Sequence, residues 1–554
     1  MQVTIQIRQQ TKDKAKSVQQ RKTFSVAAPV GLAALLRDEG ILLDYDCGKR
    51  GLCGKCRVLF LTGAPEPTAA ERACLTPAEL QEGYRLACVC TVRDDCEIVV
   101  QQRSDTMQTV GYDQGVSVSA VYAQEAQKNG VADAGKSDEK IRPTTEYGVA
   151  IDLGTTTLAF ALVDRRRGQV VRTYCSSNSQ RMYGADVMSR MERANAGDAT
   201  ALQACIIRDL TEGVLAVCSD LFAAVLGQTT EESLAVLSEV VSEIVIAGNT
   251  TMCHLLLGYS CESLATALFV PVSIAQKTFR YQQIAVTILP GVSAFIGADI
   301  VAGMYGLEFD RQREPVMLLD FGTNGEMVLW TGKEYMATSV AAGPAFEGGN
   351  ISCGCPSVYG AICGVTIARD KSMVQTIGGV PAIGICGSGL LEAVHGMRRN
   401  RLLDENGIMT DVYRQDGYAL STPGAVAPVV ITQEDVRQFQ MAKSAVATGQ
   451  QMLLEKAGIQ ARQIGQVCLA GGMGTYMSVS AAVGEGLLPE VLGRCGRTVG
   501  NTSLQGAVAF LLHREEASAR MREMIARTQV ISLAEEADFE AEYLRHMALR
   551  PWRL

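Results

Sequence analysis

The chain has 554 residues, of which 47% are hydrophobic, and its formal net charge is −8. At roughly 150 residues per domain, this length predicts three or four domains, and the apolar content suffices for packed cores. The acidic balance argues against a nucleic-acid partner, because a nucleic-acid-binding surface would be basic. No apolar run reaches about 18 residues and the start has no signal-peptide core, so we expect a cytoplasmic protein without a membrane span.

Residues 1–100 are predicted to form one small domain of strands with a short helix. Val3, Ile5 and Ile7 alternate with polar residues, which is typical of a half-buried strand. The expected elements in chain order are that strand, a hairpin partner near 24–26, a helix at 31–37 and strands at 57–61 and 95–100. A cysteine-rich loop separates the helix from the strand at 57–61. This order matches the β-grasp order of plant-type ferredoxins.

Four cysteines in this domain give the clearest chemical signal in the chain. Cys47, Cys53 and Cys56 share one glycine-rich loop, and Cys88 returns from a distant segment. Thiolates near the plant-type spacing hold a 2Fe–2S cluster, whose potential is about −400 mV in plant-type ferredoxins. The loop glycines permit the backbone angles that three convergent sulfur atoms require. These four residues are therefore the predicted iron ligands.

Two alternatives for this metal site remain open. A Cys-x2-Cys pair also binds zinc, although zinc motifs usually combine two such pairs and only one is evident here. Five residues, rather than the usual four, separate Cys47 from Cys53, and Cys90 and Cys74 are rivals of Cys88 for the fourth position. Cys88 is favoured because Arg-Leu-Ala-Cys follows the turn, as the ferredoxin pattern requires.

The rest of the chain follows an α/β pattern after a linker. Residues 101–146 lack sustained periodicity and are rich in Gly, Ala, Ser and Gln, which predicts a flexible linker. From residue 147 onward, apolar strands alternate with helical stretches such as 442–456. The expected strands include 148–153, 243–247, 316–321 and 466–470. We expect a first lobe at 147–312, a second lobe at 313–515 and a C-terminal helical extension at 516–554.

The two lobes begin with related motifs. Asp152 lies at the end of an apolar strand and Gly154 follows it, and Asp320 and Gly322 repeat this arrangement. Such an echo predicts two related lobes that face each other across a cleft. Backbone N–H groups at glycine turns bind phosphate, and aspartate holds Mg²⁺ through water. The predicted ATP-binding residues are Gly154, Thr155, Thr156, Thr157, Gly322, Thr323, Asn324 and Gly325, with Asp152 and Asp320 as catalytic residues that hold Mg²⁺.

Two further glycine-rich turns and one acid are candidates for the same cleft. The glycine turns are Gly387, Ser388 and Gly389 before a helix, and Gly471, Gly472 and Gly474 after a strand. A glycine-rich helix N-terminus can bind an anion or a ribose, although either turn could equally be a simple cap. Glu347 lies in a tight loop after the second hairpin. It is a candidate to orient an attacking water, and a structural role is the alternative.

Several other cysteines stand singly in apolar contexts. Cys205, Cys218, Cys363 and Cys468 are interpreted as small buried hydrophobic residues, which is the usual role of free cysteine. Such use of unpaired thiols fits a reducing cytoplasm, as in an anaerobe.

The motifs together resemble one family, the reductive activators of corrinoid proteins. The segments that carry the resemblance are 47–56, 150–159, 178–190, 247–258, 290–303, 318–327, 341–349, 384–389 and 501–507. The resemblance implies a multidomain α/β chain with an N-terminal β-grasp 2Fe–2S domain. It also implies a two-lobed, actin-like (ribonuclease H-like) ATPase of the acetate and sugar kinase, heat-shock and actin superfamily.

Members of that family use ATP to reduce inactive Co(II) corrinoid to Co(I) for methyltransferase systems. The resemblance therefore implies a 2Fe–2S cluster, ATP and Mg²⁺ as cofactors. The implied partners are a corrinoid protein, a low-potential electron donor and, in a homodimer, a second copy of the chain. The alternative hypothesis is an ATP-binding, redox-sensing regulatory module that delivers no electron to a corrinoid.

Overall fold

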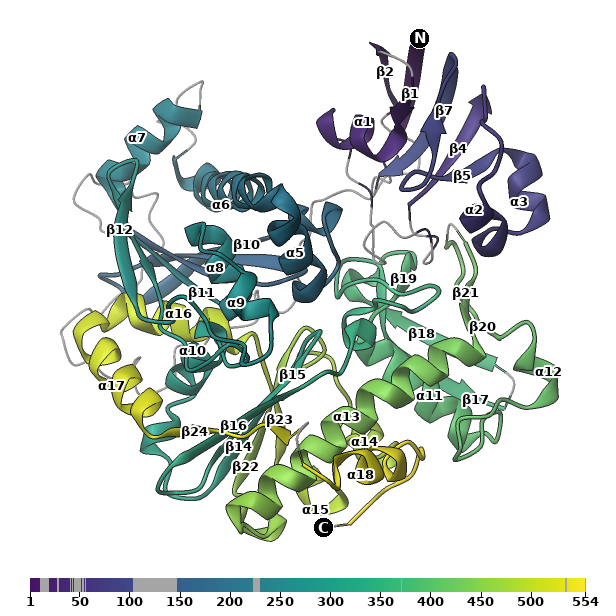
Figure 1. The fold of residues 1–554 in the computed structure, drawn as a ribbon. Coiled ribbons are helices and arrows are strands. Elements are labelled where there is room, and N and C mark those ends of the chain that lie inside the picture. Colours follow the sequence, from purple (N-terminus) through teal and green to yellow (C-terminus); the bar gives the residue numbers. More distant parts are fainter. Residues whose placement is uncertain are drawn as a thin grey trace, which may run out of the picture. The chain divides into compact units, whose positions relative to one another are not determined.

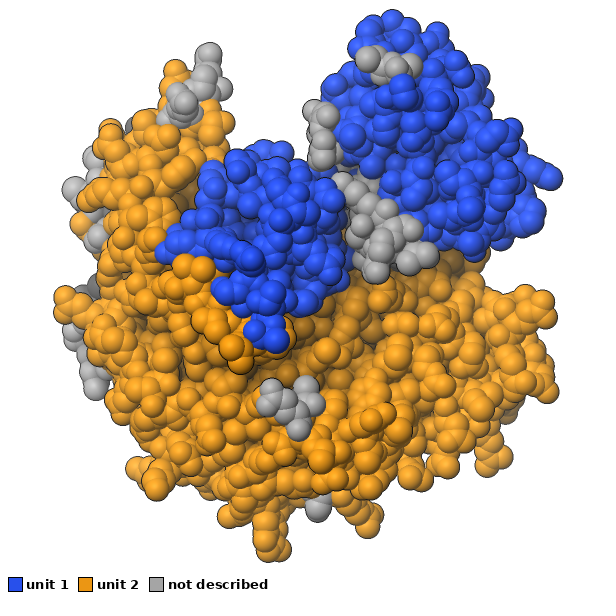
Figure 2. Space-filling model, in the orientation of Figure 1, with its two compact units in different colours: residues 1–107, 176–209, 255–267 blue, residues 108–175, 210–254, 268–554 orange. Residues whose placement is uncertain are grey.

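The computed structural model describes most of the chain in two compact units. The described residues are 1–9, 19–26, 29–39, 41, 43, 51, 54, 56–102, 147–222, 230–369, 371–425, 427–533 and 536–553. One unit comprises residues 1–107, 176–209 and 255–267, and the other comprises the remaining segments (Figure 2). The predicted linker lies outside the described residues from position 103 to its end. None of the helices in the described ranges is long and apolar enough to cross a membrane.

The first unit begins with a five-stranded sheet that matches the expected ferredoxin-like order (Figure 1). The strands and helices of this part of the chain, residues 1–102, are β1 (Gln2–Gln9), β2 (Gln19–Ser25), β3 (Val30–Gly31), α1 (Leu32–Asp38), β4 (Arg57–Thr62), α2 (Ala69–Cys74), α3 (Pro77–Glu82), β5 (Tyr84–Leu86), β6 (Thr91–Val92) and β7 (Cys96–Gln102). The sheet order is β2-β1-β7-β4-β5, with β1 parallel to β7. Val3, Ile5 and Ile98 are fully buried, which confirms the alternating pattern of the first strand.

The same unit also contains two further segments, residues 176–209 and 255–267, which are mostly helical. Their elements are η1 (Ser179–Met182), α5 (Val187–Arg193), η2 (Ala194–Asp198) and α9 (Glu262–Ala265), with parts of β10, α6 and α8. The buried Asp209 carboxylate accepts hydrogen bonds from the backbone N–H and the hydroxyl of Ser179. Arg190 is fully buried and donates to the Gly184 carbonyl oxygen at 2.9 Å. These contacts hold η1 against its neighbouring helices.

The second unit contains two six-stranded sheets. The first consists of β8 (Tyr147–Leu153), β9 (Thr157–Asp164), β10 (Gln169–Ser177), β11 (Val241–Gly248), β12 (Lys277–Tyr281) and β13 (Ile284–Ile288), in the order β10-β9-β8-β11-β13-β12. Its helices are α6 (Ala199–Phe222), α7 (Thr230–Val240), α8 (Thr250–Leu257) and α10 (Ala298–Gly306), followed by η3 (Phe309–Arg311).

The second sheet repeats the local plan of the first. It consists of β14 (Val316–Phe321), β15 (Gly325–Trp330), β16 (Tyr335–Val340), β22 (Gln466–Gly471), β23 (Gly496–Gly500) and β24 (Thr528–Val530), in the order β23-β22-β14-β15-β16-β24. In each sheet an antiparallel hairpin, β8–β9 or β14–β15, has a parallel neighbour, β11 or β22. The repeated motif of the sequence therefore corresponds to a repeated structure, and the predicted two-lobed fold class is confirmed.

Most of the remaining elements lie around the second sheet, but the last of them, α16 (Thr502–Leu512), packs against β8 and β11 of the first sheet. They are η4 (Pro344–Glu347), β17 (Ala361–Ala368), β18 (Lys371–Thr376), η5 (Ile377–Gly379), β19 (Gly384–Ile385), α11 (Gly387–Arg399), α12 (Asp411–Arg414), β20 (Tyr418–Leu420), β21 (Val429–Ile431), α13 (Gln433–Ala457), η6 (Ala461–Gln463), α14 (Val479–Gly484), α15 (Glu490–Gly493) and α16 (Thr502–Leu512). A capping box fixes the start of α13, where the Thr432 side chain accepts from the Asp435 N–H.

Helices α10 and α16 join the two lobes at a close crossing. A Cβ added to Gly506 of α16 would lie 1.9 Å from the Ala302 carbonyl oxygen of α10. Glycine therefore allows the two helix backbones to touch. The contact matters for the site, because both helices begin beside it.

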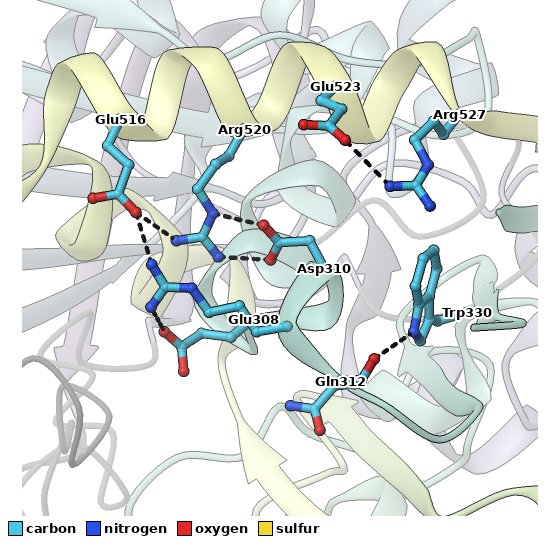
Figure 3. Close-up of polar contacts among 9 residues, drawn as sticks. Glu308, Asp310, Gln312, Trp330, Glu516, Arg520, Glu523 and Arg527 are labelled. Atoms are coloured by element: carbon cyan, nitrogen blue, oxygen red, sulfur yellow. Dashed lines mark hydrogen bonds and ion pairs between the residues drawn. The ribbon is translucent and has the colours of Figure 1, made fainter. Parts of the chain in front are cut away.

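The C-terminal tail differs in part from the predicted helical extension. It forms α17 (Arg514–Ala526) and α18 (Phe539–Arg545), but between them β24 pairs in parallel with β16. Arg520 of α17 donates to both carboxylate oxygens of Asp310, and Glu516 of the same helix also faces η3 (Figure 3). The sequence shows only the helical periodicity of this tail, whereas the short strand depends on the free edge of β16.

Candidate functional site

Two of the four predicted iron ligands lie in the described residues. Cys56 precedes β4, and Cys88 follows β5; Cys47 and Cys53 lie outside the described residues. The Ala87 N–H donates to the Cys56 carbonyl oxygen at 2.9 Å and so aligns the two segments. A hydrogen bond from the Cys56 thiol lowers the pKa of Cys88 to about 7. The two sulfur atoms therefore lie together, as ligands of a shared cluster must.

The loop geometry around these sulfur atoms also suits a cluster. Gly51 and Gly54 have φ values of 73° and 67°, a region that side chains other than glycine rarely adopt. The Gly51 N–H donates toward Cys88, which lowers the pKa of this thiol further. The described donors therefore fit an iron–sulfur site.

The two rival ligands differ in their surroundings. Cys90 is 3% exposed, and burial raises its pKa to about 12, so it belongs to the core. Cys74 lies nearer the loop, because a Cβ added to Gly54 would be 3.3 Å from its sulfur. Glu71 helps to place Cys88, since its carboxylate accepts the Leu86 N–H at 2.8 Å. No group of three potential metal ligands converges among the described residues, from which two of the predicted ligands are missing.

The second unit contains a cavity of about 550 Å³ between the two hairpin turns. Most predicted nucleotide-binding residues line it, namely Asp152, Gly154, Thr155, Thr156, Thr157, Asp320, Gly322, Thr323, Asn324, Glu347, Gly471 and Gly472. Gly471 must be glycine, because an added Cβ would lie 2.5 Å from Asp320 Oδ1. The echo in the sequence thus corresponds to two turns that face one cavity.

Five of the predicted residues do not line the cavity. They are Gly325, Gly387, Ser388, Gly389 and Gly474. A Cβ added to Gly387 would lie 2.1 Å from the Phe346 carbonyl oxygen, and one added to Gly389 would lie 2.1 Å from that of Ile362. These glycines allow α11 to pack closely against neighbouring backbone. A glycine-rich motif can therefore indicate close packing as well as a ligand site.

Glu347 connects the two turns. Its Oε2 atom accepts a hydrogen bond from Thr323 at 2.5 Å and another from Thr156 at 3.3 Å. Asn249 extends the network, because its side-chain amide donates to the Thr155 hydroxyl at 3.0 Å. The predicted catalytic acid therefore lies where the hydroxyl groups of both turns meet.

Asp152 is held at both carboxylate oxygens. Asn501 donates to Oδ2 at 2.6 Å, and Ser503 donates to Oδ1 at 2.7 Å. Asn501 also caps α16, since its side-chain oxygen accepts the Leu504 N–H. Burial nevertheless raises the pKa of Asp152 above its ordinary value.

The sequence interpretation did not include two acids of the cavity, Asp299 and Glu326. Burial, followed by the nearby Asp152, raises the pKa of Asp299 to about 7. Burial and the neighbouring Asp299 raise the pKa of Asp320 to about 8, and that of Glu326 lies well above its ordinary range. The motif at 290–303 contains Asp299 at the start of a helix, and that acid was the available signal.

The charged side chains that line the cavity are all acidic. Five carboxyl groups line it, and none of its lining residues in the described chain is lysine or arginine. Carboxylate oxygens are the ligands that Mg²⁺ prefers, and glycine turns with hydroxyl groups suit phosphates. The donor set therefore fits a Mg²⁺–nucleotide complex, whose cation would offset the carboxylate charge.

Family models match most of the chain. A model described as the 2Fe-2S iron-sulfur cluster binding domain matches residues 16–93. The RACo middle region matches 147–312, and the C-terminal domain of RACo, the ASKHA domain, matches 314–553. The corrinoid activation enzyme RamQ of Eubacterium limosum is 30% identical over 452 residues, which cover 75% of this chain and 72% of that protein. The chain belongs to the RACo family.

Two further proteins are similar to this chain over most of their length. The [Co(II) methylated amine-specific corrinoid protein] reductase of Methanosarcina barkeri is 26% identical, covering 66% of this chain and 70% of that protein. A solved structure of a reductive activator for corrinoid,iron-sulfur protein aligns with a TM-score of 0.66 and 25% identity, covering 99% of this chain and 98% of that one. The resemblance stated from the motifs is thereby confirmed.

Proposed function

We propose that this protein uses ATP to reduce the Co(II) form of a corrinoid protein to Co(I) for a methyltransferase system, one electron at a time. The observation that carries the proposal is the cavity in which two Asp-x-Gly-Thr turns meet at Glu347, in a chain that also has a 2Fe–2S domain. The names of its relatives, a corrinoid activation enzyme and a Co(II) corrinoid protein reductase, support the same activity.

The energetics explain why a nucleotide is needed. If the electron passes from the cluster to Co(II) against about 100 mV, the transfer costs about 2.3 kcal/mol. ATP can contribute this only if it binds one conformation of the protein more tightly than another. The contact of Glu347 with Thr156 supports such a difference, because it forms only when the two turns are close together.

We assign the residues as follows. The glycine turns bind phosphate groups, Asp152 and Asp320 hold Mg²⁺ through water, and Glu347 orients the attacking water. Asp299 and Glu326 add negative charge that favours the cation. Cys47, Cys53, Cys56 and Cys88 hold the cluster, which supplies one-electron chemistry at low potential when bound. The domain division given from the sequence, a low-potential electron donor and a homodimer belong to the same proposal.

Anaerobic absorbance spectroscopy tests the proposal. Full-length protein with its cluster is mixed with a Co(II) corrinoid protein, a low-potential reductant and Mg²⁺, with or without ATP. A Co(I) band that appears only with ATP, and is lost in the Asp320→Asn variant, is the expected result. A Co(I) band of equal rate without ATP, or its absence with all components and a matched corrinoid partner, would contradict the proposal.

A further inference from the structure

Three buried cysteines lie beside one another in the small sheet next to the nucleotide cavity. Cys355 follows the Gly354 bridge to β19, Cys363 lies in β17, and Cys386 directly follows β19. Neither the cluster nor the cavity lining uses any of them. The interpretation of Cys363 as a single buried hydrophobic residue describes its burial, but a single thiol would not have two others as neighbours.

The strand register places two of these thiols side by side. Ile362 pairs with Ile385 in parallel, so the next residues along the strands are Cys363 and Cys386. The Cys386 N–H donates to the Ile362 carbonyl oxygen at 3.1 Å, and its thiol donates to the same oxygen at 3.2 Å. Adjacent strands are about 4.8 Å apart, within the Cα separation of about 4.4 to 6.8 Å that a disulfide requires. The Cys363 thiol donates to the Gln375 carbonyl oxygen of β18 at 3.6 Å, so it must rotate away from that contact to reach Cys386.

The same thiols pack in one apolar cluster. Cys363 and Cys386 are 4% and 1% exposed, and Cys355 is the third thiol in contact with them. The partly buried Tyr476 packs against this cluster and also lines the nucleotide cavity. Burial and both nearby thiols raise the pKa of the Tyr476 hydroxyl to about 12. The thiols therefore lie directly behind one wall of the cavity.

A second connection leads from Cys386 to the catalytic acid. Cys386 is the N-cap of α11, and the next residue, Gly387, touches the Phe346 backbone with no room for a Cβ. Phe346 and Glu347 both line the cavity. Close-packed backbone transmits displacement, so a shift at Cys386 must move the loop that carries Glu347.

We propose that Cys363 and Cys386 are an oxidation-sensitive thiol pair whose disulfide weakens nucleotide binding. In the reaction two S–H bonds break and one S–S bond forms, while two electrons and two protons pass to the oxidant. A diazenedicarboxamide is a suitable oxidant, because it accepts both and becomes the hydrazine. A dithiol reductant reverses the step by thiol–disulfide exchange. The inference rests on nucleotide binding in the cavity, which is part of the proposed function.

Burial sets the condition for this reaction. The thiolate is the reactive form, and burial raises the pKa of Cys363 to about 12, so the closed protein reacts slowly. Tyr476 separates the thiols from the cavity, so we expect an oxidant to reach them when that wall opens and a bound nucleotide to oppose the opening. Coupling between two equilibria is reciprocal: if the disulfide weakens ATP binding, ATP opposes the disulfide by the same factor. Oxidation thus acts on the nucleotide-free protein and lowers its affinity for ATP.

The experiment uses full-length protein with its cluster, prepared without oxygen. It is treated with a diazenedicarboxamide in the presence or absence of Mg²⁺ and ATP, and peptide mass mapping follows the 363–386 cross-link. Equilibrium dialysis measures ATP affinity before oxidation, after it, and after dithiol reduction. We expect the cross-link in nucleotide-free protein, about five- to 150-fold weaker ATP binding, recovery with dithiol, and protection by ATP.

Variants distinguish the effect of oxidising Cys363 and Cys386 from the effect of oxidising other thiols. Cys386→Ser should keep its ATP affinity after oxidation, whereas Cys468→Ser, at an equally buried position in β22, should respond as the wild type does. The wild-type measurement stands even if a variant fails to fold. Absence of the 363–386 cross-link, or cross-linked protein that binds ATP unchanged, overturns the inference alone. Reduced protein that does not bind ATP would contradict the proposed function as well.

Discussion

The Thr156 hydroxyl donates a hydrogen bond to Glu347 Oε2 at 3.3 Å, although 191 residues separate the two in the chain. Thr156 belongs to the turn of the first sheet, and Glu347 follows the hairpin of the second. The same carboxylate oxygen accepts the Thr323 hydroxyl of the second turn. The contact of this one acid with Thr156 therefore depends on the distance between the two lobes, and it lies where we propose that a nucleotide phosphate binds.

Replacement of this acid separates catalysis from binding. Glu347→Gln keeps an oxygen that can accept both threonine hydroxyls but loses the base, so kcat for ATP hydrolysis should fall about 100-fold while KM changes little. Glu334→Gln, at an exposed position between β15 and β16, is the matched control and should leave both constants unchanged. Steady-state ATPase kinetics measure the difference. A normal kcat in Glu347→Gln would show that this residue is structural.

The hydroxyl of Ser503 should matter for binding of the metal–nucleotide complex. Ser503→Ala leaves Asp152 Oδ1 without its donor, a loss of about 1–3 kcal/mol for a buried charged acceptor. The expected result is a KM for Mg²⁺–ATP raised by about five- to 150-fold. Ser503→Thr retains the hydroxyl and should stay near the wild type. Equal KM values for the alanine and threonine variants would contradict this role.

The sequence predicted the parts of the site that repeat, but not the parts that depend on tertiary packing. Asp152 and Asp320 follow similar strands, so their motif is visible without a structure. Asn501 and Asp299 reach the cavity only because α16 and α10 cross at Gly506. Spacing in the sequence contains no information on that crossing.

The glycine-rich turns show that a motif visible in the sequence can still be assigned to the wrong role. Gly387 and Gly471 look alike in the sequence, since each stands in a glycine run beside an apolar segment. In the structure Gly471 lines the cavity, whereas Gly387 packs against the Phe346 backbone. Both positions exclude a side chain for steric reasons, so the residue type alone cannot distinguish a ligand contact from a packing contact.

The raised pKa values of the cavity acids predict a pH-dependent effect of Mg²⁺ on stability. The pKa values of Asp299 and Asp320 rise from 3.8 to about 7 and about 8, so the folded protein binds more protons than the unfolded chain between these limits. Without metal, stability should therefore fall as the pH rises from about 4 to about 8. Mg²⁺ offsets the charge of the ionised acids, so it should raise Tm more at pH 8 than at pH 6. Thermal unfolding at both pH values measures this, and an equal shift would contradict it.

The helix crossing at Gly506 should be intolerant of even one methyl group. In Gly506→Ala the added Cβ would lie 1.9 Å from the Ala302 carbonyl oxygen, so α16 must move away from α10. Overpacking of this kind typically costs about 1–3 kcal/mol, which predicts a lower Tm. The KM for Mg²⁺–ATP should rise as well, because α16 carries Ser503. Gly472→Ala is the control for stability, since its Cβ would meet no atom within 4 Å. A Gly506→Ala protein with unchanged Tm and KM would mean that the crossing is not a rigid link between the lobes.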